Sequence, residues 1–457
     1  MSFALPAPDP ALRCCVVVPA RDEAARIEAC LHALADQRGV APAAYEVLLV
    51  LDACSDDTAQ RADEAGAAHP RLRLLTVPGP GCGVGAARRA GMELAHQRLE
   101  SVGAHDGVLA STDADSVVAP DWLANQLAAV AGGAQAVGGR ILLHPVEAAA
   151  LGPQVLDARA REAAIRLTLV REHADDAEHH QFSGASLALT PGAYRRVGGL
   201  APLIALEDEA LEHALRSARI PIAYRNDVRV TTSARTEGRV PRGLAQVLRT
   251  TRWATRPPTE PPPDDDDGWW GRVVLVAIDG EDAARAVRGA LTGAGPEQDL
   301  VVALPGTPER ADVAALASVL AADRRLVLAK ASSTEPHPLD ELVARPLLNA
   351  NAPDLAAVRS PLAPGWAVRR SLLDGLSLPA GVALNLTVLV DAWRAHGLAA
   401  IAEVALEVDP ARSTIAPGAE AYRLMAAMSR RFAGHQPLHS GAYTTPDATL
   451  RVDLGER

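Results

Sequence analysis

The chain has 457 residues, more than one ordinary hydrophobic core requires, so we expect two domains. Its net charge of −11 and aromatic content of 3% exclude a nucleic-acid-binding surface, which needs a basic field and stacking side chains. Apolar runs stay short of the roughly 20 residues that cross a bilayer. We therefore expect no transmembrane segment, and peripheral membrane contact stays open.

The cysteines indicate a reducing compartment. An odd number of them, at spacings that fit no metal site, indicates free thiols. The N-terminal run Met-Ser-Phe-Ala-Leu-Pro lacks the basic and apolar regions of an export peptide, so we predict a cytoplasmic protein. The five cysteines are Cys14, Cys15, Cys30, Cys54 and Cys82.

The first half of the chain alternates strand-like and helix-like segments. Such alternation predicts right-handed crossovers and a mostly parallel sheet with helices on both faces. Ligands of these sheets bind beyond the carboxyl ends of the strands, where polar residues from distant segments converge. The predicted strands are residues 13–18, 45–51, 72–77 and 108–112, and the helical patterns between them are 22–37 and 58–68.

Acid-rich loops follow three of these strands, at residues 19–23, 52–57 and 113–115. Asp113 and Asp115 point the same way if the strand pleat continues through the small Ala114. Mg²⁺ and Mn²⁺ prefer carboxylate oxygens and often share substrate phosphates, so this pair predicts a metal-diphosphate site. The alternative is a helix cap at Asp115 or Ser116.

A glycine-rich segment, residues 78–91, lies between the second and third acidic loops. Its glycines open a helix, and Arg88 follows about one turn later. Glycine lets a phosphate approach the backbone, and the helix N-terminus favours an anion. An ordinary glycine-rich turn is the alternative.

Four motifs in this order, "VVVPARDE", "LLVLDACSDDT", "GVGAARRAG" and "STDADS", resemble the nucleotide-binding half of family 2 glycosyltransferases with a GT-A fold. The likeness continues through "FSGASLALTPGAYRRVGGL" and "ALEDEALEHAL" and covers about residues 13 to 250. The family usually has Asn-Glu where this chain has Arg21-Asp22-Glu23. The resemblance implies Pro19, Arg21 and Glu23 at the nucleoside, Asp52 on the base, Arg88 at the nucleotide or diphosphate, Asp113 on ribose or sugar, and Asp115 on the metal.

The acceptor side is expected around Gly184, where small residues let a sugar or acceptor lie against the backbone; a tight turn is the alternative. A strand follows at residues 187–189, and Pro191 suits the first position of a helix. Residues 207–209 are acidic and precede an amphipathic helix, where they stabilise the helix dipole. Inverting transfer also needs a carboxylate base. By resemblance to the family's Glu-Asp pair, Asp208 is the candidate base and Glu207 the second choice.

Arginines follow the predicted strand at residues 228–232. Arg235, Arg239 and Arg242 could clamp a diphosphate or an anionic acceptor, or form a solvated basic face. Many relatives place a metal-binding histidine near here, and this loop has none. We interpret His179 and His180 as surface or acceptor-loop residues rather than ligands.

A proline- and aspartate-rich segment separates the halves, which predicts domains at residues 1–255 and 269–457 joined by a linker at 256–268. Strands at 273–278, 300–304 and 326–329 make the second domain α/β as well. Residues 338–408 resemble the C-terminal half of glucosyl-3-phosphoglycerate synthases. An Asp-any-Asp after a strand is missing, and Asn385 replaces an acidic residue of that group. Arg345, Arg369 and Arg370 could bind a phosphorylated acceptor or form ion pairs.

The leading prediction is a metal-dependent, inverting glycosyltransferase that uses a nucleotide-diphosphate sugar, an unknown acceptor, and Mg²⁺ or Mn²⁺. The fold class is α/β, a GT-A mixed sheet plus a smaller GT-A-like domain. That second domain is degenerate, with a structural, dimerising or acceptor-binding role. The alternatives are a glucosyl-3-phosphoglycerate synthase-like activity and a non-catalytic carbohydrate- or nucleotide-sugar-binding pseudoenzyme.

Overall fold

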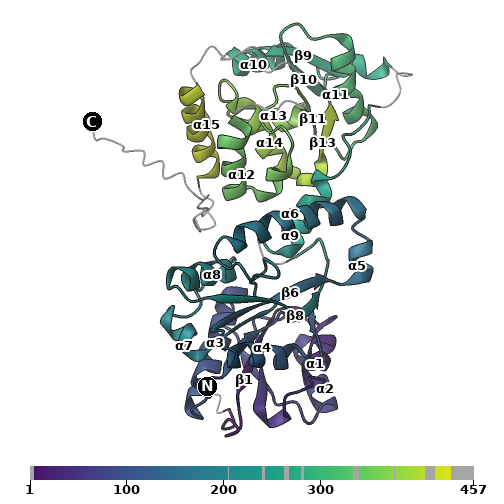
Figure 1. Ribbon diagram of the computed structural model, residues 1–457. Helices are drawn as coiled ribbons and strands as arrows, with labels where there is room; N and C mark the ends of the chain where they lie inside the picture. Colours follow the sequence, from purple (N-terminus) through teal and green to yellow (C-terminus); the bar gives the residue numbers. More distant parts are fainter. Residues whose placement is uncertain are drawn as a thin grey trace. The chain divides into compact units, whose positions relative to one another are not determined.

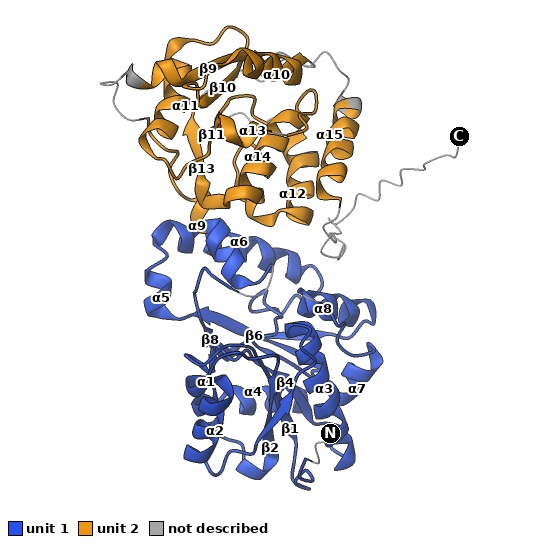
Figure 2. Cartoon of the chain, turned by 180° about the vertical axis from the view of Figure 1, so that it is seen from behind, with its two compact units in different colours: residues 1–251 blue, residues 252–457 orange. Residues whose placement is uncertain are grey.

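A computed structural model describes residues 5–203, 205–238, 242–261, 267–278, 282–332, 339–374, 376–406 and 417–433. The chain divides into two compact units, Met1–Thr251 and Arg252–Arg457 (Figure 2). The predicted domain boundaries stay a prediction, because residues 262–266 of the predicted linker lie outside the described residues. None of the described helices is both long and apolar enough to span a membrane.

The first unit is built on an eight-stranded mixed sheet with the order β3-β2-β1-β4-β7-β6-β8-β5 (Figure 1). The first four strands in this order are parallel, β7 runs antiparallel to both neighbours, and β5 runs antiparallel to β8. The strands are β1 (Cys14–Ala20), β2 (Tyr45–Leu51), β3 (Leu74–Pro78), β4 (Val108–Ser111), β5 (Ser116–Val118), β6 (Ala136–Leu143), β7 (Leu187–Leu189) and β8 (Ile222–Thr232).

Helices cover both faces of this sheet, as predicted. Helices α1 and α2 lie on one side of β1 and α3 on the other (Figure 1), and each side has its own buried core. Gly91 lets α3 pack closely, because a Cβ there would overlap Val17 of β1. The helices are α1 (Ile27–Ala35), α2 (Thr58–Ala68), α3 (Val84–Ser101), α4 (Trp122–Ala131), α5 (Pro145–Ala149), α6 (Pro153–Arg171), α7 (Pro191–Arg196), α8 (Glu207–Ser217) and α9 (Leu244–Ala254).

The chain turns directly after β4. The Ser116 amide donates to the Asp113 carbonyl oxygen at 3.0 Å, which closes a turn over Ala114 and Asp115. The strand pleat therefore does not continue through Ala114, and a turn places the two carboxylates. The helix-cap alternative is wrong, because β5 intervenes and α4 begins only at Trp122.

The second unit has a five-stranded sheet with the order β13-β11-β12-β10-β9. Its first strand, β9, lies at the sheet edge, whereas β1 lies inside the first sheet. The predicted fold class, a large mixed α/β sheet plus a smaller α/β domain, is confirmed. The elements are β9 (Val273–Ile278), β10 (Leu300–Pro305), β11 (Leu328–Ser332), β12 (Trp366–Arg369), β13 (Ile401–Ala405), α10 (Ala283–Gly293), α11 (Arg310–Ala322), α12 (Arg345–Asn351), α13 (Arg370–Leu373), α14 (Ala383–His396) and α15 (Pro417–Phe432).

The chain's single lysine, Lys330, lies buried on β11 and donates to the Ala363 carbonyl oxygen at 2.7 Å. Burial lowers the pKa of this amine from 10.5 to about 8, against the opposing charges of Asp340 and Glu403. The folded chain thus releases this proton near pH 8, whereas the unfolded chain keeps it to higher pH. For this amine the unfolded state binds more protons across this window, so Lys330 contributes a rise in the free energy of unfolding with pH.

We expect this rise to be about 3 kcal/mol for the second unit between pH 8 and 10.5. Urea titrations at several pH values measure it, and the Lys330→Met variant should lose it. A variant with the same slope as the wild type would contradict this assignment.

Candidate functional site

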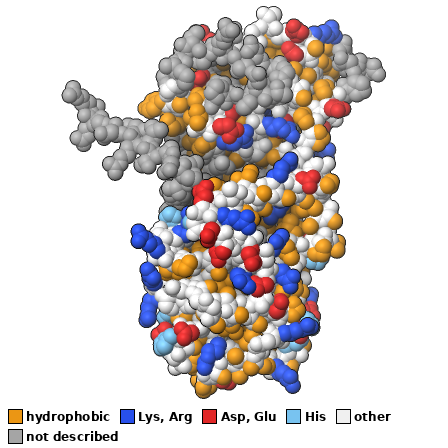
Figure 3. All heavy atoms as spheres, in the orientation of Figure 1, with side chains coloured by type: hydrophobic (Ala, Val, Ile, Leu, Met, Phe, Trp, Pro, Cys, Tyr) orange, Lys and Arg blue, Asp and Glu red, His pale blue; other side chains and the backbone are white. Residues whose placement is uncertain are grey.

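Acidic side chains from separate segments gather at the carboxyl edge of the first sheet. Glu23 follows β1, Asp52 follows β2, and Asp113 and Asp115 follow β4. The first turn of α8 adds Glu207 and Asp208 from beyond the sheet. Figure 3 shows acidic and basic side chains close together on one face of the molecule. Parallel strands explain the gathering, because their carboxyl ends share one edge.

Arg88 is the buried centre of this site. It ion-pairs with Glu207 and with Asp113, and its Nε donates to the Ser111 hydroxyl at 3.0 Å. Arg88 is 2% exposed. Its guanidinium therefore lies beneath the acidic surface and joins the end of β4 to α8.

Gly184 is needed for this arrangement, because a Cβ at that position would overlap the Arg88 guanidinium. Its amide also donates to Asp208 Oδ2 at 3.0 Å. Asp208 is half-buried, and Glu207 beside it is buried. Burial raises the pKa of Glu207, and the Arg88 charge opposes the shift. The two acids thus differ: Glu207 faces inward to Arg88, and Asp208 is the more accessible carboxylate.

Arg235 joins Glu23 and Asp115, which come from different loops. Its two terminal nitrogens lie 2.7 and 3.1 Å from the Glu23 oxygens, and Nη2 also lies 3.1 Å from Asp115 Oδ2. Thr232 donates to the other Asp115 oxygen at 3.3 Å. Burial and the neighbouring Asp113 raise the pKa of Asp115 to about 6.

Asp52 holds the glycine-rich segment in place. Its two carboxylate oxygens accept from the amides of Gly81 and Gly83, at 2.6 and 3.0 Å. A Cβ on Gly79 would come within 2.6 Å of the same carboxylate. The glycines at this point therefore let the loop fold against Asp52, ahead of the first turn of α3.

Two residues in the left-handed backbone region directly precede site side chains. Asp22, before Glu23, has φ of 51°, and Leu206, before Glu207, has φ of 61°. Ser55 stabilises the first turn, since its amide and hydroxyl donate to Asp22 at 2.6 and 3.1 Å. Non-glycine residues rarely adopt this conformation except where the surrounding structure imposes it, often at functional sites.

The remaining predicted residues lie at different depths. Pro19 is buried within β1, and Arg21 is exposed. Arg239 lies outside the described residues. His179 is buried, which removes the surface position from its two expected placements and leaves the acceptor loop untested: Nε2 lies 3.1 Å from the Arg225 carbonyl oxygen, and Nδ1 accepts from the Gln181 amide.

Ser111 and Thr232 belong to the site but were missed from the sequence. Each ends a strand, and each hydroxyl contacts a predicted site residue, Arg88 for Ser111 and Asp115 for Thr232. The sequence did contain a signal for them, because each is a polar residue at the carboxyl end of a buried strand. Pairing of β5 with β8, which places Ser116 opposite Thr232, could not be foreseen from local pattern.

The residues here fit a divalent cation bound mainly through its substrate. Four carboxylates, Glu23, Asp113, Asp115 and Glu207, contact two guanidinium groups, Arg88 and Arg235. Within the described ranges, no group of three or more His, Cys, Asp or Glu side chains could enclose an ion. Magnesium-type ions commonly take one or two carboxylates plus substrate phosphates. Asp115, which contacts Arg235 and Thr232 here, is the carboxylate predicted for this role.

The second unit's arginines hold its own backbone. Arg345 donates to the carbonyl oxygens of residues 356, 358 and 359, Arg369 to those of 320, 323 and 326, and Arg370 to those of 291, 294 and 295. Asn385 is buried, accepts from the Trp366 indole and donates to the Leu362 carbonyl oxygen. Structural roles therefore explain all four residues.

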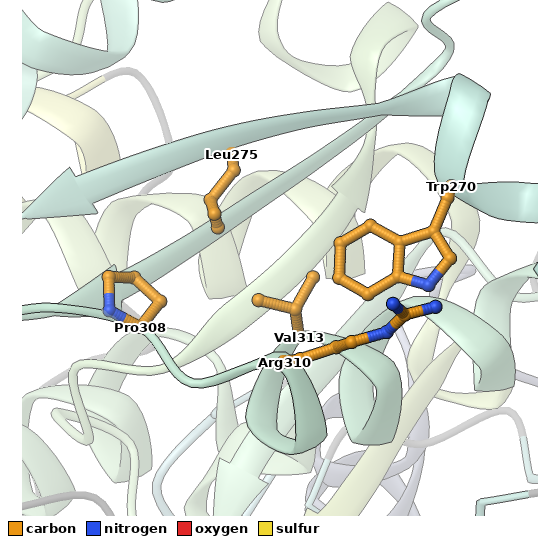
Figure 4. A pocket seen from close by; sticks show the side chains of 5 residues that line it. All are labelled: Trp270, Leu275, Pro308, Arg310 and Val313. Atoms are coloured by element: carbon orange, nitrogen blue, oxygen red, sulfur yellow. The ribbon is translucent and has the colours of Figure 1, made fainter.

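The second unit carries a pocket of about 560 Å³ (Figure 4). Its described lining is Trp270, Leu275, Pro308, Arg310 and Val313, which includes no carboxylate. The Arg310 guanidinium lies 4.9 Å from the Trp270 ring centre, and Trp269 stacks on the same indole. This pocket lacks the acidic groups that the first unit gathers.

Residues 15–177 match the model of glycosyl transferase family 2. The first unit thus contains a family 2 glycosyltransferase domain, as the motifs suggested. Glucosyl-3-phosphoglycerate synthase of Mycobacterium tuberculosis (strain ATCC 25618 / H37Rv) is 44% identical over 68 residues, 15% of this chain and 21% of the relative. The synthase of Mycolicibacterium paratuberculosis is 41% identical over 91 residues, 20% of this chain and 26% of the relative. The chain thus spans about a quarter or less of these curated relatives.

Solved glycosyltransferases show a looser likeness. The mannosyltransferase PcManGT from Pyrobaculum calidifontis, in complex with GDP-Man and Mn²⁺, is 22% identical, with 55% of this chain and 64% of that chain covered and a TM-score of 0.37. Glucosyl-3-phosphoglycerate synthase from M. tuberculosis, in complex with phosphoglyceric acid, is 16% identical, with coverage of 93% and 82% and a TM-score of 0.29.

Proposed function

We propose that this protein is a glycosyltransferase that moves a sugar from a nucleotide-diphosphate sugar to an acceptor hydroxyl, with the chemistry in the first unit. The observation that carries this is the gathering of Glu23, Asp52, Asp113, Asp115 and Asp208 at one sheet edge. The family 2 domain at residues 15–177 supplies part of this edge and supports the same conclusion.

Asp208 is the proposed base of an inverting transfer. The acceptor oxygen bonds to the anomeric carbon as the bond from that carbon to the diphosphate oxygen breaks, and the electron pair leaves with the diphosphate. The hydroxyl proton passes to Asp208. Glu207, the second candidate, is less suited because it is buried against Arg88.

The donor would lie along the loops after β1, β2 and β4. We propose Pro19, Arg21 and Glu23 near the nucleoside, Asp52 beside the base and Asp113 at ribose or sugar. Arg88 would act indirectly, by holding Asp113 and Glu207. A bound Mg²⁺ or Mn²⁺, held by Asp115, would supply positive charge for the leaving diphosphate. A cytoplasmic location remains part of the proposal.

Glucosyl-3-phosphoglycerate synthase-like activity is the same-class alternative. The similarity to those synthases over 68 to 91 residues favours it. It requires a site for a phosphorylated acceptor, and the second unit's Arg345, Arg369 and Arg370 already donate to backbone carbonyls. Any such acceptor would therefore have to bind elsewhere. A nucleotide-sugar-binding pseudoenzyme is the other alternative.

A thermal-shift screen of nucleotide sugars, with and without manganese, tests donor binding directly. A donor at 100 times its Kd stabilises the folded chain by about 2.7 kcal/mol, which raises the melting temperature. Asp115→Asn should remove the manganese-dependent part of the shift. If no donor shifts the wild type and none is turned over, the proposed function is wrong. Donor binding without turnover would favour the pseudoenzyme.

A further inference from the structure

The Arg235 guanidinium holds two acidic side chains in unequal ways. Its contact with Glu23 is bidentate, at 2.7 and 3.1 Å, and Glu23 is buried. The Glu23 backbone is itself fixed, because its amide donates to the Thr58 hydroxyl at 2.7 Å. This side of the contact is rigid.

The contact with Asp115 is weaker. It is a single one at 3.1 Å, and it uses the same Nη2 that already serves Glu23. The Asp115 side chain is also more exposed than that of Glu23, 13% against 8%. Of the two contacts, the one with Asp115 is therefore easier to break.

We propose that Arg235 is an exchangeable cation of the donor site. While Asp115 has no divalent ion, Arg235 neutralises it. When Mg²⁺ or Mn²⁺ takes Asp115, Arg235 keeps Glu23 and turns its freed N–H toward the diphosphate. This inference rests on the proposed function, because it assigns a diphosphate to this edge.

Arg235 should compete with the divalent ion for Asp115 and cooperate with it in binding the diphosphate. A divalent ion and Arg235 neutralise the same carboxylate, so each weakens the other's hold on Asp115. Guanidinium also matches phosphate oxygens in a planar, bidentate geometry, so the displaced group favours the diphosphate. The Glu23 anchor keeps it within reach. Arg235 should therefore oppose metal binding alone and assist nucleotide binding once the metal is present.

The test compares wild type with Arg235→Gln in two binding measurements that need no turnover. The first is a titration of Mn²⁺ alone, with free manganese followed by electron paramagnetic resonance. The second is a titration of UDP and of GDP at saturating manganese, followed by calorimetry. A charged hydrogen bond corresponds to about tenfold in affinity. We expect manganese to bind about tenfold more tightly in the variant and the better diphosphate about tenfold more weakly.

Arg26→Gln is the matched control. Arg26 lies near enough for its charge to act on Asp115, but its ion pair is with Glu147 at 3.5 Å. It removes the same charge without breaking a contact to Asp115, so its effect on manganese affinity should be smaller. Manganese binding that is lost in Asp115→Asn is the binding that depends on Asp115.

In Arg235→Gln, manganese affinity should rise and diphosphate affinity should fall. A general loss of structure would instead weaken the binding of both ligands. Unchanged or weaker manganese binding in Arg235→Gln would overturn the inference, as would an equal effect of Arg26→Gln or no Asp115-dependent manganese in either protein. The proposed function fails separately, if the wild type neither binds nor turns over any nucleotide sugar.

Discussion

Replacing Asp208 by Asn is expected to lower the transfer rate by about 10² to 10⁴-fold while donor affinity stays unchanged, because the variant cannot accept the acceptor proton. Asparagine keeps an oxygen for the Gly184 amide, which donates to Asp208 at 3.0 Å in the wild type. The fold of this turn should therefore survive. Initial rates and donor titrations on the same preparations separate catalysis from binding.

Glu209→Gln is the matched control for this experiment, since it removes the same charge from the next residue of α8. The Glu209 side chain is exposed, and the transfer rate of this variant should stay close to that of the wild type. Should Asp208→Asn retain its activity while Glu207→Gln loses it, the base would be Glu207 and the assignment made here would be wrong.

Arg88→Met is expected to lower the free energy of unfolding by about 3 to 5 kcal/mol, because it leaves the buried Glu207 carboxylate without its counter-charge. Glu207 faces this guanidinium with a side chain that is 5% exposed. Donor binding should weaken as well, since Asp113 loses the same partner. Urea unfolding followed by circular dichroism measures the change in the free energy of unfolding.

Arg89→Met gives the comparison for the same substitution one residue along α3. Arg89 is half-buried and donates to the Leu200 carbonyl oxygen at 3.0 Å, so losing it should remove about 1 kcal/mol. Adding Glu207→Gln to Arg88→Met should recover part of the loss, because the uncompensated charge disappears. Equal destabilisation by the two methionine substitutions would contradict the central role of Arg88.

The sequence was sufficient for elements with strong local pattern. The bounds of β2 and α2 were predicted as observed, because a continuous apolar run and an alanine-rich helix each have clear ends. Pro191 begins α7, and the Thr190 hydroxyl caps it by accepting from the Ala193 amide at 3.2 Å. The same patterns predicted that polar residues meet at the carboxyl edge of the first sheet, because β3, β2, β1 and β4 are parallel.

Side-chain partners could not be predicted, because they depend on which distant segments meet. Arg88 was expected to support the nucleotide or diphosphate, and its ion pair with Glu207 joins segments that are 119 residues apart in the sequence. The same is true of Arg235, whose partners Glu23 and Asp115 are far away in sequence. In the second unit, the sequence left Arg345, Arg369 and Arg370 as either a phosphate site or ion-pairing groups, and it could not predict their backbone carbonyl acceptors.

The central claim is that the first unit transfers sugar from a nucleotide-diphosphate donor at the edge that holds Asp115 and Asp208. The most direct test is nucleoside diphosphate release from a panel of nucleotide sugars by the full chain with manganese, compared with Asp208→Asn. We predict release from at least one donor by the wild type and its loss in the variant. Equal release by both proteins, or none from any donor, would contradict the claim.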